Sequence, residues 1–225
     1  MRHARTFLAP IALLLAAGPA PVHAVDGEWA SYRDAYRAMV VFEKYGGPKN
    51  LLQSQLQVLP KDRAALGDGA ELTVAGKTVQ LHLPLDPLGR TPLPLQKSAY
   101  DENATLVLNR KGTPFALRPQ VAIAARPDGV YDSADLRSAC GQALGFARHV
   151  DAAQRSRQCA GVRFVFNKKG ESGAHLRRAG GMEETLPATT GEEGLPAVSY
   201  RFGAGGERGQ VVTNSVPLAI LPVFE

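Results

Sequence analysis

Apolar residues recur every three or four positions in two stretches of the chain, the spacing that places them along one face of an α-helix. The first stretch predicts a helix over residues 28–45, which ends where Gly-Gly-Pro at residues 46–48 interrupts the pattern. The second stretch predicts a helix over residues 133–150, with Asp132 or Ser133 as its N-cap. Two amphipathic helices are therefore expected.

Aromatic residues gather on the first of these helices, where one face carries Trp29, Tyr32, Tyr36, Met39 and Val40. Flat aromatic rings also suit the faces of sugars, so the same residues could form a stacking platform. The helical spacing, however, already explains them as residues that pack against the rest of the protein. We therefore interpret this face as part of the core.

Outside the helices the hydrophobic pattern changes to a period of two, which is typical of half-buried β-strands. The clearest case is residues 52–58, where leucine, serine and valine alternate with glutamine. Residues 71–83 predict a hairpin, and the prolines within residues 84–94 predict an edge strand or an extended connector. Further strands are predicted at residues 103–109, 115–126, 162–166, 198–202, 210–214 and 219–224.

Glycine and charged residues dominate residues 168–195, so we expect a long mobile loop there. The pattern as a whole predicts a single α+β domain over residues 25–225. In this domain an antiparallel β-sheet or sandwich of roughly seven to nine short strands is packed by the two helices.

Residues 1–24 have the composition of an export signal. The basic residues Arg2 and Arg5 precede an apolar run at residues 7–17, and small residues follow up to Ala24. The apolar run is shorter than the roughly 18 to 20 residues that span a bilayer, so we predict cleavage after Ala24 rather than an uncleaved anchor. No later apolar stretch is long enough to span a membrane. The protein is therefore expected in the periplasm or secreted from the cell.

The two cysteines of the chain, Cys140 and Cys159, both follow the predicted signal. An oxidising compartment and an even number of cysteines favour a disulfide between them, although two buried free thiols are the alternative. Cys140 falls on the apolar face of the second helix, and Cys159 precedes a predicted strand. A bond would join these two elements and contribute about 3 kcal/mol in the chain-entropy model. Neither cysteine belongs to a Cys-x-x-Cys pair, so redox catalysis has no motif.

Composition excludes several classes of protein. A hydrophobic content of 44% and a charged content of 21% exclude a disordered acidic tail and a collagen-like repeat. The formal net charge is +5, and two of the positive charges, Arg2 and Arg5, lie in the predicted signal. This balance indicates no nucleic-acid partner.

Motifs for cofactors and nucleophiles are incomplete. Gly-Lys-Thr at residues 76–78 matches the end of a phosphate-binding loop, but position 71, where the motif needs glycine, holds glutamate. Residues 203–209 miss the dinucleotide pattern because Arg208 stands in place of its last glycine. Residues 170–173 lack one spacer of the Gly-x-Ser-x-Gly nucleophile motif. We therefore assign no catalytic and no cofactor-binding residue.

Titratable residues also lack the spacing of a catalytic or metal site. His82, His149 and His175 lie in separate predicted elements, without the short spacing that metal ligands have. Asp101 and Glu102 could suggest a glycosidase pair, but adjacent side chains usually diverge. No metal ion is therefore expected.

Three segments resemble uncharacterised exported proteins of unknown function from Gram-negative bacteria: residues 83–90, 100–110 and 161–166. The resemblance implies a periplasmic location and carries over no catalytic residue. The Asp-x-x-Gly-Arg sequence at residues 86–90 is also similar to turns of β-sandwich modules that accompany secreted enzymes, which is an analogy of fold alone.

Two functional hypotheses follow. The first is a non-catalytic binding or protein-interaction module of the cell envelope, in which loops on a β scaffold contact a partner protein or an envelope glycan. The alternative is a periplasmic hydrolase whose site is assembled from residues far apart in the sequence. A pocket with convergent titratable groups would favour the hydrolase, and a flat apolar patch with a polar rim would favour the module.

Overall fold

The structure is a computed structural model that describes residues 29–62, 66–168, 171–178, 180–191, 194–203 and 208–225. The predicted signal at residues 1–24 lies outside the described residues, as does part of the glycine-rich segment 203–209.

The described residues form three α-helices, one 3₁₀ helix and fifteen β-strands. The helices are α1 (Tyr32–Lys44), α2 (Lys97–Asp101), α3 (Ser133–Val150) and the 3₁₀ helix η1 (Ala152–Gln154). The first eight strands are β1 (Trp29–Ser31), β2 (Leu52–Pro60), β3 (Glu71–Ala75), β4 (Gln80–Pro84), β5 (Arg90–Thr91), β6 (Thr105–Leu108), β7 (Phe115–Ile123) and β8 (Val130–Asp132). The remaining seven are β9 (Cys159–Val165), β10 (Ala174–Arg178), β11 (Glu183–Leu186), β12 (Ala188–Thr190), β13 (Pro196–Arg201), β14 (Gly209–Thr213) and β15 (Ala219–Phe224).

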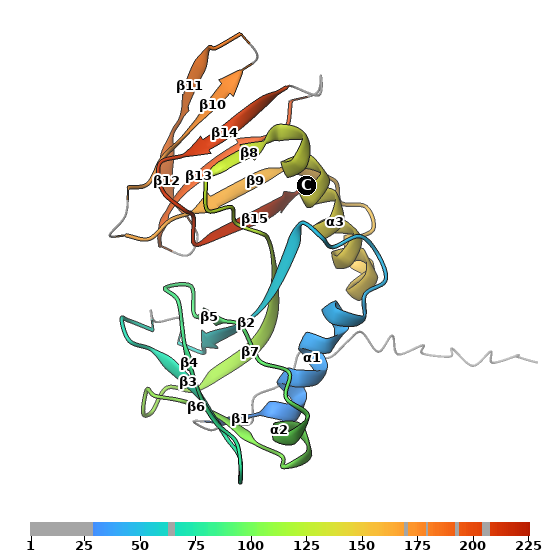
Figure 1. Ribbon diagram of the computed structural model, residues 1–225, viewed down its shortest axis with the longest axis vertical. Coiled ribbons are helices and arrows are strands. Elements are labelled where there is room, and N and C mark those ends of the chain that lie inside the picture. The colour runs from blue at the N-terminus through green and yellow to red at the C-terminus, as the bar shows by residue number, and fades with distance from the viewer. Residues whose placement is uncertain (1–28, 63–65, 169–170, 179, 192–193, 204–207) are drawn as a thin grey trace, which may run out of the picture.

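These strands form three antiparallel sheets, with the orders β1-β6-β3-β4, β11-β10-β14-β8 and β12-β13-β9-β15-β7-β2-β5. In the seven-stranded sheet β15 pairs with β7 through one residue pair, Ile220 and Ile123, so the sheet divides there into two parts. Figure 1 shows β2 and β7 running from the part beside β3, β4 and β6 toward α3. The predicted α+β class, with antiparallel strands in a sandwich-like arrangement packed by helices, is confirmed, although the strands are more numerous than expected.

One hydrophobic core lies between α1, the first sheet and one face of β2 and β7. Leu56, Val58 and Leu117 reach it from alternate positions of β2 and β7, as the period of two predicts. Tyr32 and Met39 of α1 are also buried in it, which confirms their interpretation as core residues.

The first helix begins later than predicted, and this changes the place of Trp29. Ser31 is its N-cap, and the hydroxyl of Ser31 accepts a hydrogen bond from the amide of Asp34 at 3.3 Å. Trp29 lies before this cap in β1, and 44% of its surface is exposed. The interpretation of Trp29 as a core residue on a helix is therefore wrong, because extended backbone before the cap turns its ring outward.

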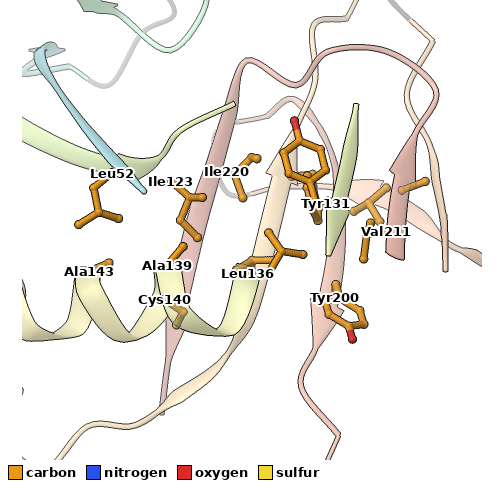
Figure 2. Packing of buried hydrophobic residues seen from close by; sticks show 14 of the residues in the cluster. Leu52, Ile123, Tyr131, Leu136, Ala139, Cys140, Ala143, Tyr200, Val211 and Ile220 are labelled. Atoms are coloured by element: carbon orange, nitrogen blue, oxygen red, sulfur yellow. The ribbon is translucent and has the colours of Figure 1, made fainter. Parts of the chain in front are cut away.

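A second core forms around α3 and the strands β8, β9, β13, β14 and β15. Figure 2 shows Leu136, Ala139 and Ala143 of α3 on the side of the helix that faces Ile123 and Ile220. The predicted helix 133–150 and its buried face are confirmed. Asp132 occupies the N-cap position, but its carboxylate accepts a hydrogen bond from Gln210 instead of capping the helix.

The predicted disulfide between Cys140 and Cys159 is present, with 6.0 Å between the two Cα atoms. It joins α3 to the start of β9, and Cys140 is fully buried. The alternative of two free thiols is wrong.

Residues 168–195 were expected to form a loop, yet they contain β10, β11 and β12. The prediction is wrong for these strands. Only Ala174 and Leu176 of β10 are buried, so the apolar alternation is too short to stand out in the sequence. Pairing with the distant strand β14 stabilises β10, and this pairing is invisible in a local pattern.

The Asp-x-x-Gly-Arg turn at residues 86–90 connects the two parts of the structure. Arg90 is 2% exposed and donates two hydrogen bonds to one carboxylate oxygen of Asp86, at 3.0 and 2.7 Å. The same guanidinium donates to the carbonyl of Leu218, just before β15, at 2.5 Å. The turn requires Gly89 because its φ is +72° and a Cβ there would lie 2.6 Å from the carbonyl oxygen of Val58.

Candidate binding cleft

The Gly-Lys-Thr sequence at residues 76–78 forms the turn between β3 and β4, and its amides already bind an anion of the protein itself. The carboxylate of Glu102 accepts hydrogen bonds from the amides of Lys77 and Thr78, at 2.7 and 3.0 Å, and from the Thr78 hydroxyl. These bonds, with that of the Thr78 side chain the strongest, lower the pKa of Glu102 below its usual 4.5. The neighbouring Asp101 pairs with Lys97 instead, so the two acids diverge.

His82, His149 and His175 belong to three separate elements of the fold, β4, α3 and β10. His82 of β4 is 2.8 Å from a carboxylate oxygen of Glu71, and the ring of His149 in α3 lies 5.1 Å from that of Tyr45. His175 belongs to β10. Among the described residues, no group of three or more histidine, cysteine or acidic side chains could hold a metal ion.

One cleft, about 720 Å³, lies at the N-terminal end of α3. Two of its polar side chains, those of Ser133 and Arg137, form contacts within the protein. The hydroxyl of Ser133 accepts a hydrogen bond from the amide of Gly209, and the guanidinium of Arg137 donates to the carbonyl of Gly203 and stacks on the ring of Phe202. Because these contacts already engage Ser133 and Arg137, we place the candidate site elsewhere.

A second cleft, about 350 Å³, lies at the ends of β10 and β14, beside the corner where the chain passes from β11 to β12. We call it the β10–β11 cleft; both strands are in the upper left of Figure 1. Polar side chains and a short apolar segment line it together: Ser172, Gly173, Ala174, His175, Glu183, Thr185, Leu186, Pro187, Ala188 and Asn214.

Strand pairing brings these residues together from three segments of the chain. His175 of β10 is the register partner of Thr185 in β11, so their side chains lie on the same face of the sheet. Asn214 follows β14, and its backbone amide donates a hydrogen bond to the backbone carbonyl of Gly173 at 3.0 Å. A Cβ at Gly173 would lie 2.7 Å from the carboxamide nitrogen of Asn214. Glycine at 173 therefore leaves the space that the Asn214 side chain occupies.

The charges in the cleft are balanced within the protein. One carboxylate oxygen of Glu183 accepts a hydrogen bond from Arg177 at 3.0 Å. The Nε2 atom of His175 lies 3.9 Å from the same oxygen, which is beyond hydrogen-bond distance. The carboxylate is therefore bound to the arginine, and it does not orient the histidine ring.

This arrangement decides what the cleft can do chemically. It does contain a histidine and a carboxylate, with Ser172 close by, which are the residue types of a hydrolase. An activated serine needs a hydrogen bond to a base that a third group orients. Neither bond occurs among the hydrogen bonds of the described residues. The polar groups of the cleft can still donate to and accept from a bound molecule, as in most ligand sites.

One face of the first sheet carries an exposed row of side chains. Register pairing aligns Trp29, Val107, Thr73 and His82 in one row across its four strands. Trp29 and Val107 are 44% and 37% exposed, so the row places an apolar pair beside a hydroxyl and a histidine.

Local reasoning missed Thr185, Glu183 and Asn214 because the first two fall in the segment expected to be a loop, and the third follows a separate strand. The opposite charges of Arg177 and Glu183, which are register partners in β10 and β11, were the one available signal of a hairpin there.

The fold and the cleft define an α+β protein with three antiparallel sheets, one disulfide and a small polar cleft at the strand ends. Comparison with protein-family models, curated proteins and solved structures finds no match to the chain. The resemblance to exported proteins therefore stays a prediction. In the described part of the chain, no helix has the length and apolar character needed to cross a membrane.

Proposed function

We propose that the protein is an exported, non-catalytic binding module of the cell envelope and that it holds its partner at the β10–β11 cleft. The observation that carries the proposal is the geometry of Glu183, which is bound to Arg177 at 3.0 Å and is 3.9 Å from His175. Side chains placed in this way provide hydrogen bonds to a ligand but no activated nucleophile.

Two further features support the proposal. The disulfide between Cys140 and Cys159 suits the oxidising compartment that the signal-like residues 1–24 imply. The exposed row that contains Trp29 and Val107 offers two apolar side chains to a partner.

The test is native mass spectrometry of the full chain, expressed with its leader and isolated gently from the periplasm. Denaturing mass without reductant should show cleavage after Ala24 and the loss of two hydrogens for the disulfide. In the native spectrum we expect a bound molecule or partner that the double variant Thr185→Val, Asn214→Ala loses. Met182→Ala, which changes an exposed residue outside the cleft, is the matched control and should retain it.

Two results would contradict the proposal. An uncut chain would show that the signal is not cleaved and would contradict the exported location. A partner that the double variant retains equally would show that the cleft is not the binding site.

The alternative hydrolase is favoured by one observation, the presence of Ser172, His175 and Glu183 in the same cleft. It predicts turnover of an ester probe or of isolated peptidoglycan that disappears in Ser172→Ala. We expect no turnover that depends on Ser172, and its detection would replace the binding module with the hydrolase.

A further inference from the structure

The size of the β10–β11 cleft limits what it can hold. At about 350 Å³ it lies near the lower end of the roughly 300–1,000 Å³ range of ligand pockets. A single small ring fits this volume, whereas an extended peptide with several side chains would use a strand edge instead.

The lining of the cleft combines polar and apolar side chains. The carboxamide of Asn214 and the hydroxyls of Ser172 and Thr185 can each donate and accept hydrogen bonds. Leu186 and Pro187 provide the apolar surface at the corner between β11 and β12. A sugar ring has the complementary character, since its hydroxyl groups project from the rim and its C–H groups cover the faces.

The charge balance favours a neutral ligand. Arg177 compensates the carboxylate of Glu183 at 3.0 Å, so the cleft has no excess charge to offer a charged molecule. A charged ligand would lose hydration on entry without gaining a counterion. A neutral molecule with many hydroxyl groups needs no counterion, and Asn214 and Thr185 can replace hydrogen bonds that its hydroxyl groups lose to water.

We infer that the β10–β11 cleft binds one ring of a neutral, hydroxyl-rich carbohydrate. The inference rests on the proposed function, because it names the ligand class of the same site. Asn214 and Thr185 supply the hydrogen bonds that select hydroxyl groups, and Gly173 keeps the space that Asn214 needs.

The experiment follows the histidine ring signals by NMR while neutral trisaccharides (cellotriose, maltotriose and N,N′,N″-triacetylchitotriose) are added to the exported chain. Three histidines follow the predicted cleavage site, so His82 and His149 serve as internal controls for His175. We expect one of the sugars to shift the signals of His175 alone, saturating with a Kd of about 1 mM or tighter.

Variants test whether the cleft carries the binding. Thr185→Val and Asn214→Ala each remove a hydrogen-bonding group and should weaken binding about tenfold, whereas Met182→Ala should leave it unchanged. Gly173→Ala should also weaken binding, because the added methyl group displaces the Asn214 side chain. Urea unfolding of each variant verifies that it is folded.

Each contrary result has a separate meaning. If none of the three sugars shifts His175, or if both cleft variants bind as well as the parent protein, the carbohydrate inference is wrong. If short peptides shift His175 and the sugars do not, the ligand class is wrong while the cleft remains the binding site. If, in addition, the native spectra show a partner that the cleft variants retain, the proposed function is wrong as well as the carbohydrate inference.

Discussion

Replacing Arg90 by methionine tests whether a buried ion pair holds the two parts of the structure together. Arg90 is 2% exposed and makes two hydrogen bonds to Asp86 and one to the carbonyl of Leu218. The Asp86 side chain is 24% exposed, so after the substitution its carboxylate keeps some hydration. Removing one partner of a buried pair costs about 3 to 5 kcal/mol, and the partial exposure of Asp86 places the expected loss near the lower value.

Urea unfolding measures this loss as a change in the free energy of unfolding. A loss of about 3 kcal/mol lowers the midpoint by roughly 1 M urea for a protein of this size. Arg126→Met is the matched control, because Arg126 also pairs with an aspartate, Asp128, but both side chains are more than half exposed. Its expected cost is below about 1 kcal/mol.

A double-variant cycle with Asp86→Asn separates the pair from its surroundings. One nitrogen of Arg90, Nη1, is buried and has no hydrogen-bond partner among the described residues, which already reduces the net benefit of the pair. We expect the second substitution to cost less in the presence of the first than it does alone. Equal losses for Arg90→Met and Arg126→Met would refute the reasoning, because burial would then contribute nothing to the stability of the pair.

Three further predictions concern stability. Reducing the Cys140–Cys159 bond should lower the free energy of unfolding by about 3 kcal/mol, and a denaturation midpoint that does not respond to reductant would contradict its structural role. The pKa of Glu102 is lowered in the folded protein, so its contribution to stability is present above the unfolded pKa near 4.5 and is lost as the pH falls through the folded value. Glu102→Gln should therefore flatten the acid side of the stability profile, and a profile identical to that of the parent protein would show that the bonds to the β3–β4 turn are not stabilising. Gly89→Ala should destabilise by about 2 kcal/mol or more, because its φ is +72° and a backbone oxygen blocks the added methyl group. In α3, a Cβ added at Gly141 would meet no described atom within 4 Å apart from its chain neighbours and the backbone of the helix itself. Gly141→Ala should therefore stabilise by up to about 1 kcal/mol, and the same sign at both glycines would be evidence against this account.

The two functional hypotheses differ in what they require of the same cleft. A hydrolase requires His175 to accept a proton from Ser172 while a carboxylate holds the ring, and Glu183 is instead bound to Arg177. A binding module requires groups that reach a ligand without reacting with it. The variants of Ser172 and Asn214 therefore distinguish chemistry from binding at one site.

Local sequence patterns were sufficient where one face of an element is buried along its whole length. The 18-residue helix at residues 133–150 repeats its apolar face over about five turns, at about 3.6 residues per turn. Cys140 on that face correctly indicated the disulfide with Cys159. The alternation at residues 52–58 similarly predicted β2. In these elements the local period and the tertiary burial agree.

Elements stabilised by distant partners were not visible in the local pattern. Trp29 continues the helical spacing of α1, but the cap at Ser31 and pairing of β1 with β6 place it in an exposed strand. The strand β10 has only two buried side chains and depends on β14, which lies more than 30 residues later. A period of two needs several alternations to be recognised, and these short strands do not supply them.

By itself, the sequence determined the α+β class, the α3 helix and the cysteine pair, because each depends on a local period or on residue counts that the fold does not alter. Only the tertiary structure decided that Thr185, Asn214 and Gly173 meet in one cleft. It also decided that the carboxylate of Glu183 is hydrogen-bonded to Arg177 and not to His175. The physical reason is that strand pairing and register join segments far apart in the chain, and a one-residue change of register would place these side chains on the opposite face of the sheet.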